Sequence, residues 1–183
     1  MLQTTYETIW FFLPAIIANM LPVFAARFNW LPLLNRPLDA GLCWHHHRIL
    51  GDHKTVRGLV VGVVGGGVTG TLQYLLSLIG LMQVNNILVF HTLGEGFLYG
   101  SLIGFGAIFG DALKSFFKRR FHMPSGSSWK PWDQIDLVIG VVIVTSWWAH
   151  LTFLNVVIAF VMIGFGSYVV SFIGAVLGIK KSV

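Results

Sequence analysis

Five long apolar segments limit the possible folds of this chain more strongly than any other feature of the sequence. They run from Ile9 to Ala26, Gly58 to Leu81, Leu88 to Leu113, Leu137 to Phe153 and Val156 to Ile179. A helix needs about 20 apolar residues to cross the hydrocarbon core of a bilayer, which is about 30 Å thick. Only 10% of the 183 residues are charged and 55% are hydrophobic, which is unusual for a water-soluble protein. We therefore predict an all-α integral membrane protein with about five transmembrane helices in a single domain, residues 1–183.

Positive charges fall on alternate connections between these segments. All Lys and Arg residues lie between the first and second segments, between the third and fourth, or at the C-terminus. The connections at 82–86 and 150–155 contain none. Because Lys and Arg in short loops favour the cytoplasmic side, we predict a multi-pass protein of the cell membrane. Its N-terminus would lie outside, and its C-terminus and two charged loops would lie in the cytoplasm.

Acidic residues gather on the same predicted face, although Asp and Glu contribute little to membrane orientation. Five of the seven acids are found there: Asp39, Asp52, Asp111, Asp133 and Asp136. A carboxylate close to the bilayer is costly and usually has a partner or a function. Asp111 precedes Lys114 by three residues and Lys118 by seven, so a helix would place all three on one side. Asp133 and Asp136, at i and i+3, would share one face of the fourth helix.

Carboxylates, cations and a loop rich in Ser, Gly and Pro at one interface favour phosphate chemistry with Mg²⁺. This ion binds one or two carboxylates together with phosphate oxygens, while Lys and Arg neutralise the remaining phosphate charge. The first charged loop brings Asp39, Lys54, Thr55 and Arg57 to the same face. These residue types therefore predict a site for phosphate groups at the cytoplasmic surface of the membrane.

Ordinary structural explanations exist for each of these residues taken singly. The three consecutive cations at 118–120 would neutralise a helix C-terminus and anchor it among lipid headgroups. A carboxylate in the first turn of the fourth helix would cap it, and Asp111 would pair with Lys114. The histidines between Trp44 and Arg48 point in different directions on any regular element, so we interpret them as part of an interfacial loop.

Glycine recurs every four residues in the second and third segments. The two stripes are Gly58, Gly62, Gly66 and Gly70, and Gly96, Gly100 and Gly104. Such stripes let helix backbones approach closely. The second segment also contains a GxGxxG pattern at Gly65, Gly67 and Gly70, but no strand precedes it, as a dinucleotide-binding turn would require. We therefore interpret these glycines as packing positions.

Four motifs, in this order, carry a resemblance to a known family. They are ANMLPV at 18–23, RPLDAG at 36–41, LGDHKTVRG at 50–58, and GDALKSFFKRR followed by PSGSSWKPWDQID within 110–136. With these motifs the chain resembles the CDP-archaeol synthases, which look like small relatives of the CDP-diacylglycerol synthases. The Pro-Gly-His-Gly-Gly run of the larger bacterial enzymes does not follow Met123, which favours the small branch.

The resemblance implies a membrane cytidylyltransferase that condenses CTP with an isoprenoid ether-lipid phosphate of the archaetidic-acid type. It also implies Mg²⁺ as the cofactor and roles for individual residues. Asp111 and Asp133 would bind the metal with support from Asp136, and Asp111, Lys118, Arg119 and Asp133 would form the catalytic set. Substrate contacts would fall to Asn19, Asp39, Lys54, Thr55, Arg57, Lys114, Ser115 and Arg120.

Other functions stay open at this point. The same reaction on diacyl phosphatidic acid would give CDP-diacylglycerol instead. An anion transporter usually keeps its polar groups near the midplane of the membrane within repeated halves, and this sequence has no internal repeat. A non-catalytic scaffold that binds anionic lipids would need the cations but not the aspartates. We expect no nucleic-acid partner, and the sequence favours no particular oligomeric state.

Overall fold

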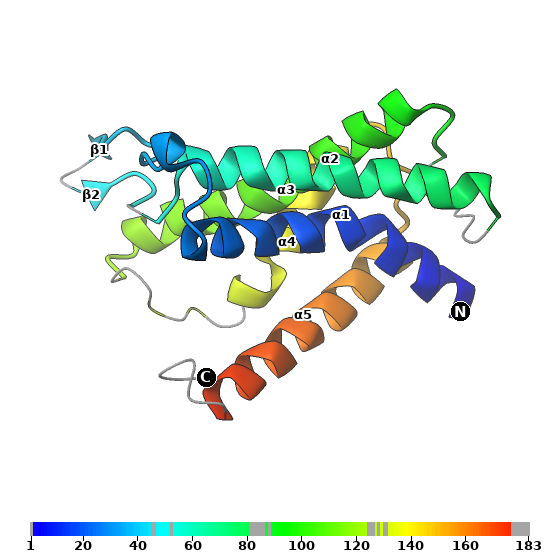
Figure 1. Cartoon of the computed structure of the whole chain (residues 1–183). Coiled ribbons are helices and arrows are strands. Elements are labelled where there is room, and N and C mark those ends of the chain that lie inside the picture. Colours follow the sequence, from blue (N-terminus) through cyan, green and yellow to red (C-terminus); the bar gives the residue numbers. More distant parts are fainter. Residues whose placement is uncertain are drawn as a thin grey trace.

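The computed structural model of the chain describes residues 2–44, 47–51, 53–80, 87, 89–123, 127, 129 and 132–176. Helices dominate these described residues (Figure 1). The five α-helices are α1 (Leu2–Arg27), α2 (Val56–Leu78), α3 (Leu93–Arg120), α4 (Trp132–Thr145) and α5 (Phe153–Val176). A short 3₁₀ helix, η1 (Pro32–Leu34), and an antiparallel pair of two-residue strands, β1 (Cys43–Trp44) and β2 (His47–Arg48), lie between α1 and α2. The prediction of an all-α protein with five helices is confirmed.

Several predicted features fall outside the described residues. They are two of the three histidines between Trp44 and Arg48 (positions 45 and 46), Asp52, the connection at 82–86, most of the Ser-, Gly- and Pro-rich loop at 124–131, and the C-terminal lysines at 180 and 181. The predicted ends of the second and fifth segments, at Leu81 and Ile179, lie there as well.

Three helices within the described residues are long and apolar enough to cross a membrane. These are α1, α2 and α3, with mean hydropathies of 2.0, 1.6 and 1.4. The fourth predicted segment was too long at its C-terminal end, because α4 stops at Thr145 and not near Phe153. The backbone N–H groups of Trp148 and Ala149 both donate to the Thr145 carbonyl oxygen, which closes the last turn. With 14 residues, α4 is about 21 Å long, which is shorter than the bilayer core.

Local sequence explains where α2 and α3 begin. Thr55 caps α2, and its hydroxyl oxygen accepts a hydrogen bond from a backbone N–H in the first turn. At the start of α3, the Thr92 hydroxyl oxygen accepts the Glu95 N–H at 3.1 Å, while the Glu95 carboxylate accepts the His91 N–H at 2.8 Å. Such caps satisfy donors that have no partner inside the helix.

Glycines allow the central helices to lie almost backbone against backbone. A Cβ atom added to Gly66 of α2 would lie 2.5 Å from the carbonyl oxygen of Gly100 on α3. One added to Gly110 of α3 would lie 2.9 Å from the carbonyl carbon of Asp136 on α4. No larger residue fits at such separations. The packing interpretation of the glycine stripes is therefore confirmed, and the second contact brings α4 directly beside the polar end of α3.

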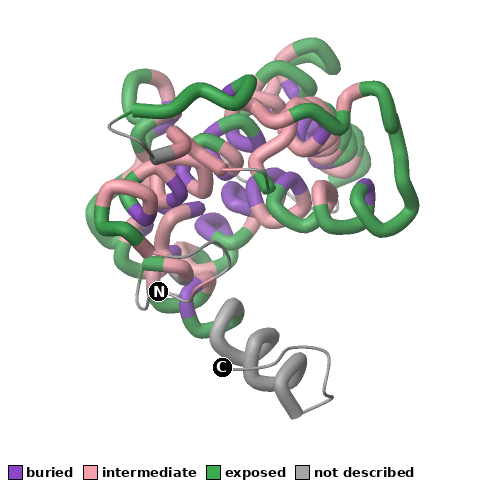
Figure 2. The backbone as a smooth tube through the Cα atoms, turned by 90° about the vertical axis from the view of Figure 1, so that its left-hand side faces the viewer, coloured by how far each residue is buried: buried purple, intermediate pink, exposed green. Residues whose placement is uncertain are grey.

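Buried positions concentrate where the helices meet, and outward faces are exposed (Figure 2). The apolar core joins four helices through Phe12 and Ala15 of α1, Ile103 and Ala107 of α3, Val138 and Val141 of α4, and Ala159 of α5. Large apolar side chains such as Val23, Leu72 and Phe165 face outward. Extensive exposed apolar surface is unfavourable in water, and it fits a protein surrounded by lipid.

Candidate active site

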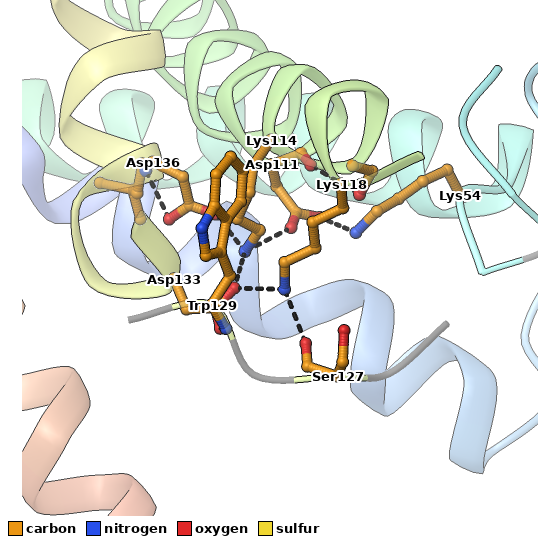
Figure 3. Close-up of polar contacts among 10 residues, drawn as sticks. Lys54, Asp111, Lys114, Lys118, Ser127, Trp129, Asp133 and Asp136 are labelled. Carbon is orange, nitrogen blue, oxygen red and sulfur yellow. Dashed lines mark hydrogen bonds and ion pairs between the residues drawn. The ribbon is translucent and has the colours of Figure 1, made fainter. Parts of the chain in front are cut away.

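Three aspartates and three lysines meet at one end of the helix bundle (Figure 3). Lys54 comes from the loop before α2, Asp111, Lys114 and Lys118 come from α3, and Asp133 and Asp136 come from the start of α4. We call these six residues the Asp–Lys cluster. Helical spacing had predicted that the three α3 residues share one side of the helix, and this prediction is confirmed.

Lys114 lies at the centre of the Asp–Lys cluster. Its Nζ atom lies 2.5 Å from Oδ2 of Asp136, and 3.2 Å from Oδ1 of both Asp111 and Asp133. The Lys114 side chain is only 14% exposed. One ammonium group therefore connects carboxylates from two neighbouring helices, away from most of the screening by water.

The other two lysines contact the outer ends of the cluster. Lys54 pairs with Oδ2 of Asp111. Lys118, which is buried, places Nζ 2.7 Å from Oδ1 of Asp133 and also donates to the Ser127 carbonyl oxygen at 2.8 Å. Three positive and three negative charges thus balance within the cluster, as partly buried charges must to limit the cost of their desolvation.

Asp133 also organises the start of α4. Its Oδ2 atom accepts the Trp129 N–H, and its own N–H donates to the Trp129 carbonyl oxygen at 3.0 Å. Asp133 is therefore not the N-cap of α4: it lies in the first turn, and its carboxylate reaches back to a backbone N–H that precedes the helix. The two carboxylate oxygens of Asp133 thus have different partners: Oδ2 accepts the Trp129 N–H, and Oδ1 pairs with Lys114 and Lys118.

Several predicted substrate ligands have partners inside the protein. The Ser115 hydroxyl donates at 2.9 Å to the backbone carbonyl one turn earlier on α3. Thr55 serves as the N-cap of α2. Arg57 is buried and donates to Oδ1 of Asn29 at 3.3 Å and to the Trp30 carbonyl oxygen at 3.4 Å. These three residues support the frame around the Asp–Lys cluster.

Asp39 does not point into the cluster, but forms the centre of the loop between α1 and α2. Its carboxylate accepts hydrogen bonds from Arg48, with Nη2 at 2.6 Å, and from the backbone N–H groups of Gly41, Leu50 and Gly51 at 3.0–3.2 Å. Burial by itself raises the pKa of Asp39, but Arg48 and the three backbone donors outweigh it and hold this pKa well below its ordinary value.

This loop determines where Lys54 stands. The Leu38 N–H donates to the Lys54 carbonyl oxygen at 2.7 Å, and the Val56 N–H donates to the Arg36 carbonyl oxygen at 2.9 Å. The backbone on both sides of Lys54 is thereby joined to the segment that carries Asp39. The structure thus connects Asp39 to the cluster through the backbone, and not through a direct side-chain contact.

Arg120 docks the strand pair onto the end of α3. Its guanidinium donates to the carbonyl oxygens of Trp44 at 2.9 Å and Arg48 at 3.2 Å. It also lies over the rings of Trp44 and Phe116, 5.0 and 5.1 Å from their centroids. Cation–π contacts of this kind stabilise by about 0.5–2 kcal/mol. Arg120 therefore holds the first loop against α3.

Arg119 and Asn19 are less constrained by internal contacts. Arg119 donates from Nη1 to the Met123 carbonyl oxygen at 2.8 Å. Within the described residues its Nε atom is buried and has no hydrogen-bond partner. Asn19 is exposed on α1 and lines a cavity together with Lys54 and Asp111. Both residues offer polar groups that a bound molecule could use.

Two cavities of similar size reach the Asp–Lys cluster. The first, about 480 Å³, is bounded by α1, α2 and α3 and meets the cluster at Lys54 and Asp111. Its wall also contains Asn19, Pro22, Val23, Thr55, Leu59 and Ile108. The second, about 500 Å³, is bounded by α3 and α4 and meets the cluster at Lys114 and Asp136. Its wall is largely aromatic, with Phe117, Phe121, Trp129 and Trp132.

The donor atoms of the cluster suit a hard cation. Within the described part of the chain, no group of three or more His, Cys, Asp or Glu residues forms a ready-made metal site. However, oxygen atoms from three aspartates already surround the positive charge of Lys114. Mg²⁺ prefers oxygen ligands and usually takes only one or two carboxylates together with phosphate oxygens. The residues present therefore fit Mg²⁺ that arrives with a phosphate.

Comparison with known proteins identifies the family. The family model described as CarS-like, CDP-archaeol synthase, matches residues 1–183. The chain belongs to the CDP-archaeol synthase family. The CDP-archaeol synthase of Thermococcus onnurineus (strain NA1) is 38% identical over 131 residues, which cover 71% of this chain and 68% of that protein. The CDP-archaeol synthase of Methanosarcina barkeri (strain Fusaro) is 33% identical over 181 residues, or 92% and 98% of the two chains.

A solved structure shares the fold of this CDP-archaeol synthase family member. It is described as an intramembrane enzyme for archaeal membrane lipids biosynthesis, with a TM-score of 0.72 and 29% identity over 90% of this chain and 92% of that one. The resemblance inferred from the four motifs is therefore confirmed. The chain is a membrane protein and an enzyme of the CTP-dependent cytidylyltransferase class.

Sequence reasoning missed two features of this site. It did not predict the aromatic wall formed by Phe117, Phe121, Trp129 and Trp132, although the density of aromatic residues around the charged motif was a visible signal. It also did not predict that Lys114 joins three aspartates. Spacing on α3 indicated only the pair with Asp111, because contacts with α4 depend on how closely the two helices approach.

Proposed function

We propose that this enzyme transfers CMP from CTP to an isoprenoid ether-lipid phosphate of the archaetidic-acid type, with Mg²⁺ as its cofactor. The products are a CDP-lipid and pyrophosphate. The Asp–Lys cluster is the observation that carries this proposal, because it combines carboxylates for a metal with cations for phosphates and adjoins two separate cavities. Membership of the CDP-archaeol synthase family supports the reaction class.

The reaction exchanges one phosphate linkage for another. An oxygen of the lipid phosphomonoester attacks the α-phosphorus of CTP, and the bond from this phosphorus to the oxygen of the β-phosphate breaks. Pyrophosphate leaves opposite the attacking oxygen. No protein nucleophile is needed, because positioning and charge neutralisation supply most of the catalysis in phosphoryl-type transfers.

The aspartates of the cluster would hold the metal, while two of its lysines and the neighbouring Arg119 would contact phosphate groups. Asp111 and Asp133, supported by Asp136, would hold Mg²⁺, which when bound supplies positive charge to the phosphate oxygens of the reacting groups. Lys118 and Arg119 neutralise negative charge on the triphosphate and on the departing pyrophosphate. Lys54 lies beside Asp111 in the wall of the first cavity, where it can contact a second phosphate group.

The location of the cluster suits one substrate from water and one from the membrane. It lies at the end of α3 that carries the basic residues Lys118, Arg119 and Arg120. Basic residues favour the cytoplasmic side, so we place the active site at the cytoplasmic face of the cell membrane. There CTP arrives from the cytoplasm, while the lipid phosphate stands at headgroup depth.

A radiochemical assay tests the proposed reaction. Purified full-length protein in detergent is incubated with α-labelled CTP, Mg²⁺ and either an archaetidic-acid-type lipid or diacyl phosphatidic acid. We expect labelled lipid and released pyrophosphate with the ether lipid. Labelling of phosphatidic acid alone would instead favour the diacyl reaction. Absence of label with both lipids, in folded protein, would contradict the proposed activity and favour the scaffold or transporter.

Two aspartate variants test the proposed metal ligands. Asp111→Asn and Asp133→Asn should each lower turnover roughly a hundredfold or more, because each removes negative charge from the metal site while it conserves shape. Glu95→Gln is the matched control, since it neutralises an acid at the opposite end of the same helix as Asp111, and its turnover should stay near that of the wild type. A folded Asp111→Asn or Asp133→Asn protein with wild-type turnover would remove that residue from the metal site.

A further inference from the structure

Lys114 is a cation surrounded by three carboxylates of the protein. An ammonium group has three N–H donors and no acceptor. The Nζ atom of Lys114 lies within 2.5–3.2 Å of one oxygen from each of three residues, Asp111, Asp133 and Asp136 (Figure 3). Three carboxylates thus surround one ammonium group, and each aspartate that is proposed to bind the metal already contacts a positive charge.

We propose that Lys114 occupies the place of the metal ion in the substrate-free enzyme and leaves it when the metal arrives with the nucleotide. This inference rests on the proposed function, because it concerns the same cluster. A divalent cation on these carboxylates would stand within a few ångströms of the Lys114 ammonium if the lysine stayed. Two like charges so close together repel strongly at the low effective dielectric constant of a partly buried site.

The other two lysines of the cluster cannot serve this purpose. Among the aspartates that the structure describes, Lys54 contacts only Asp111, and Lys118 contacts only Asp133. Neither connects the carboxylates of α3 to those of α4 as Lys114 does. Exchange with the metal is therefore a property of Lys114 alone.

A neighbouring cavity can accept the Lys114 side chain when its ammonium group leaves the carboxylates. Its side chain lines the cavity between α3 and α4, and four flexible carbons carry the ammonium group. Without ligands the cluster has three positive and three negative charges. A divalent cation raises the net charge of the cluster from zero to +2. The released ammonium group then faces the negative triphosphate. The arrangement disfavours metal binding without nucleotide and favours the two together.

Binding of Mn²⁺, measured by electron paramagnetic resonance of the free ion, tests this exchange without any turnover. The full-length protein in detergent is titrated with Mn²⁺ alone, and with Mn²⁺ and CTP in the absence of lipid. The same titrations without protein are subtracted, because CTP itself binds Mn²⁺. Wild-type protein should bind Mn²⁺ much more tightly when CTP is present. Lys114→Gln should bind Mn²⁺ without CTP about tenfold more tightly than the wild type, or more, because the competing charge is gone.

Two further variants serve as matched controls. Lys118→Gln removes the same charge from the same helix but frees only one aspartate, so Mn²⁺ affinity without CTP should rise clearly less. Lys114→Arg keeps the charge and should keep the weak Mn²⁺ binding of the wild type. Unfolding temperatures in detergent establish that each variant is folded.

The possible outcomes separate this inference from the proposed function. Equal gains in Mn²⁺ affinity without CTP for Lys114→Gln and Lys118→Gln would overturn the exchange of Lys114 for the metal. No gain in this affinity for a folded Lys114→Gln protein would overturn it as well. Wild-type protein that binds Mn²⁺ equally well with and without CTP would also overturn it, even if no Lys114 variant folds. Wild-type protein that does not bind Mn²⁺ at all in the presence of CTP would instead contradict the metal dependence in the proposed function.

Discussion

At the residue scale, the same chemical group serves different purposes in this protein according to its surroundings. Asp39, in the loop between α1 and α2, and Asp111, on α3, are both aspartates that pair with a basic residue. Asp39 is 6% exposed and receives backbone donors as well as Arg48, so it holds a loop. Within the described residues, the Asp111 carboxylate pairs only with lysines and faces a cavity, so it can exchange its partners for a ligand.

Replacing Asp39 should damage both stability and the position of Lys54. Asp39→Ala removes the carboxylate that accepts from Arg48 and from three backbone N–H groups, and a buried donor that loses its acceptor costs about 1–3 kcal/mol. We expect a lower unfolding temperature in detergent and a raised KM for CTP, with a smaller change in kcat. An unchanged KM in folded Asp39→Ala protein would show that the loop does not position Lys54.

The contribution of Asp39 should also depend on pH in one direction. Its pKa is lowered in the folded protein, so its stabilising effect is complete above the unfolded pKa of about 3.9 and is lost as the pH falls toward the folded value. The difference in unfolding temperature between the wild type and Asp39→Asn should therefore be constant from about pH 5 to 8 and shrink toward pH 3. A difference that grew in acid would contradict this assignment.

At the element scale, the close approach of α3 and α4 creates the cluster. Lys114 stands on α3, while Asp133 and Asp136 stand on α4, and they meet because Gly110 packs against the backbone beside Asp136. Helix α4 is short and ends at Thr145. Its start therefore matters more for the site than its length, because the first two turns carry both carboxylates.

Widening the contact between α3 and α4 at Gly110 should reduce activity without unfolding the protein. In Gly110→Ala the new Cβ would lie 2.9 Å from the Asp136 carbonyl carbon, so α4 must move and draw its carboxylates away from Lys114. We expect turnover to fall roughly tenfold or more, since small displacements of reacting groups are costly. Gly94→Ala is the matched control, because its Cβ would meet nothing closer than 3.8 Å. Equal turnover in the two variants would exclude this role for Gly110.

At the scale of the whole molecule, charge and apolar surface divide between different regions. Exposed apolar side chains line the outer helix faces, whereas the Asp–Lys cluster lies together with the basic end of α3. In the proposed reaction, this separation would let the lipid remain in the membrane while its phosphate reaches the charged groups. The basic residues at this end predict that the site lies on the cytoplasmic side.

The single cysteine of the chain tests that orientation. Cys43 is exposed and lies in the loop that carries Lys54. If this loop is cytoplasmic, a membrane-impermeant maleimide should leave Cys43 unlabelled in intact cells and label it after permeabilisation. Cys43→Ser provides the background. Labelling in intact cells would place the loop outside and overturn the predicted orientation.

The sequence by itself determined the membrane class, five helices and the residue types of the site, because apolar length, glycine spacing and charge are local properties of the chain. It also carried the family, through four ordered motifs around residues such as Lys54 and Asp111. Only the tertiary structure decided that Lys114 joins three aspartates, that Asp39 turns into its own loop, and that α4 ends at Thr145. These features depend on which backbones approach one another, and the distances between helices are set by packing across the whole bundle.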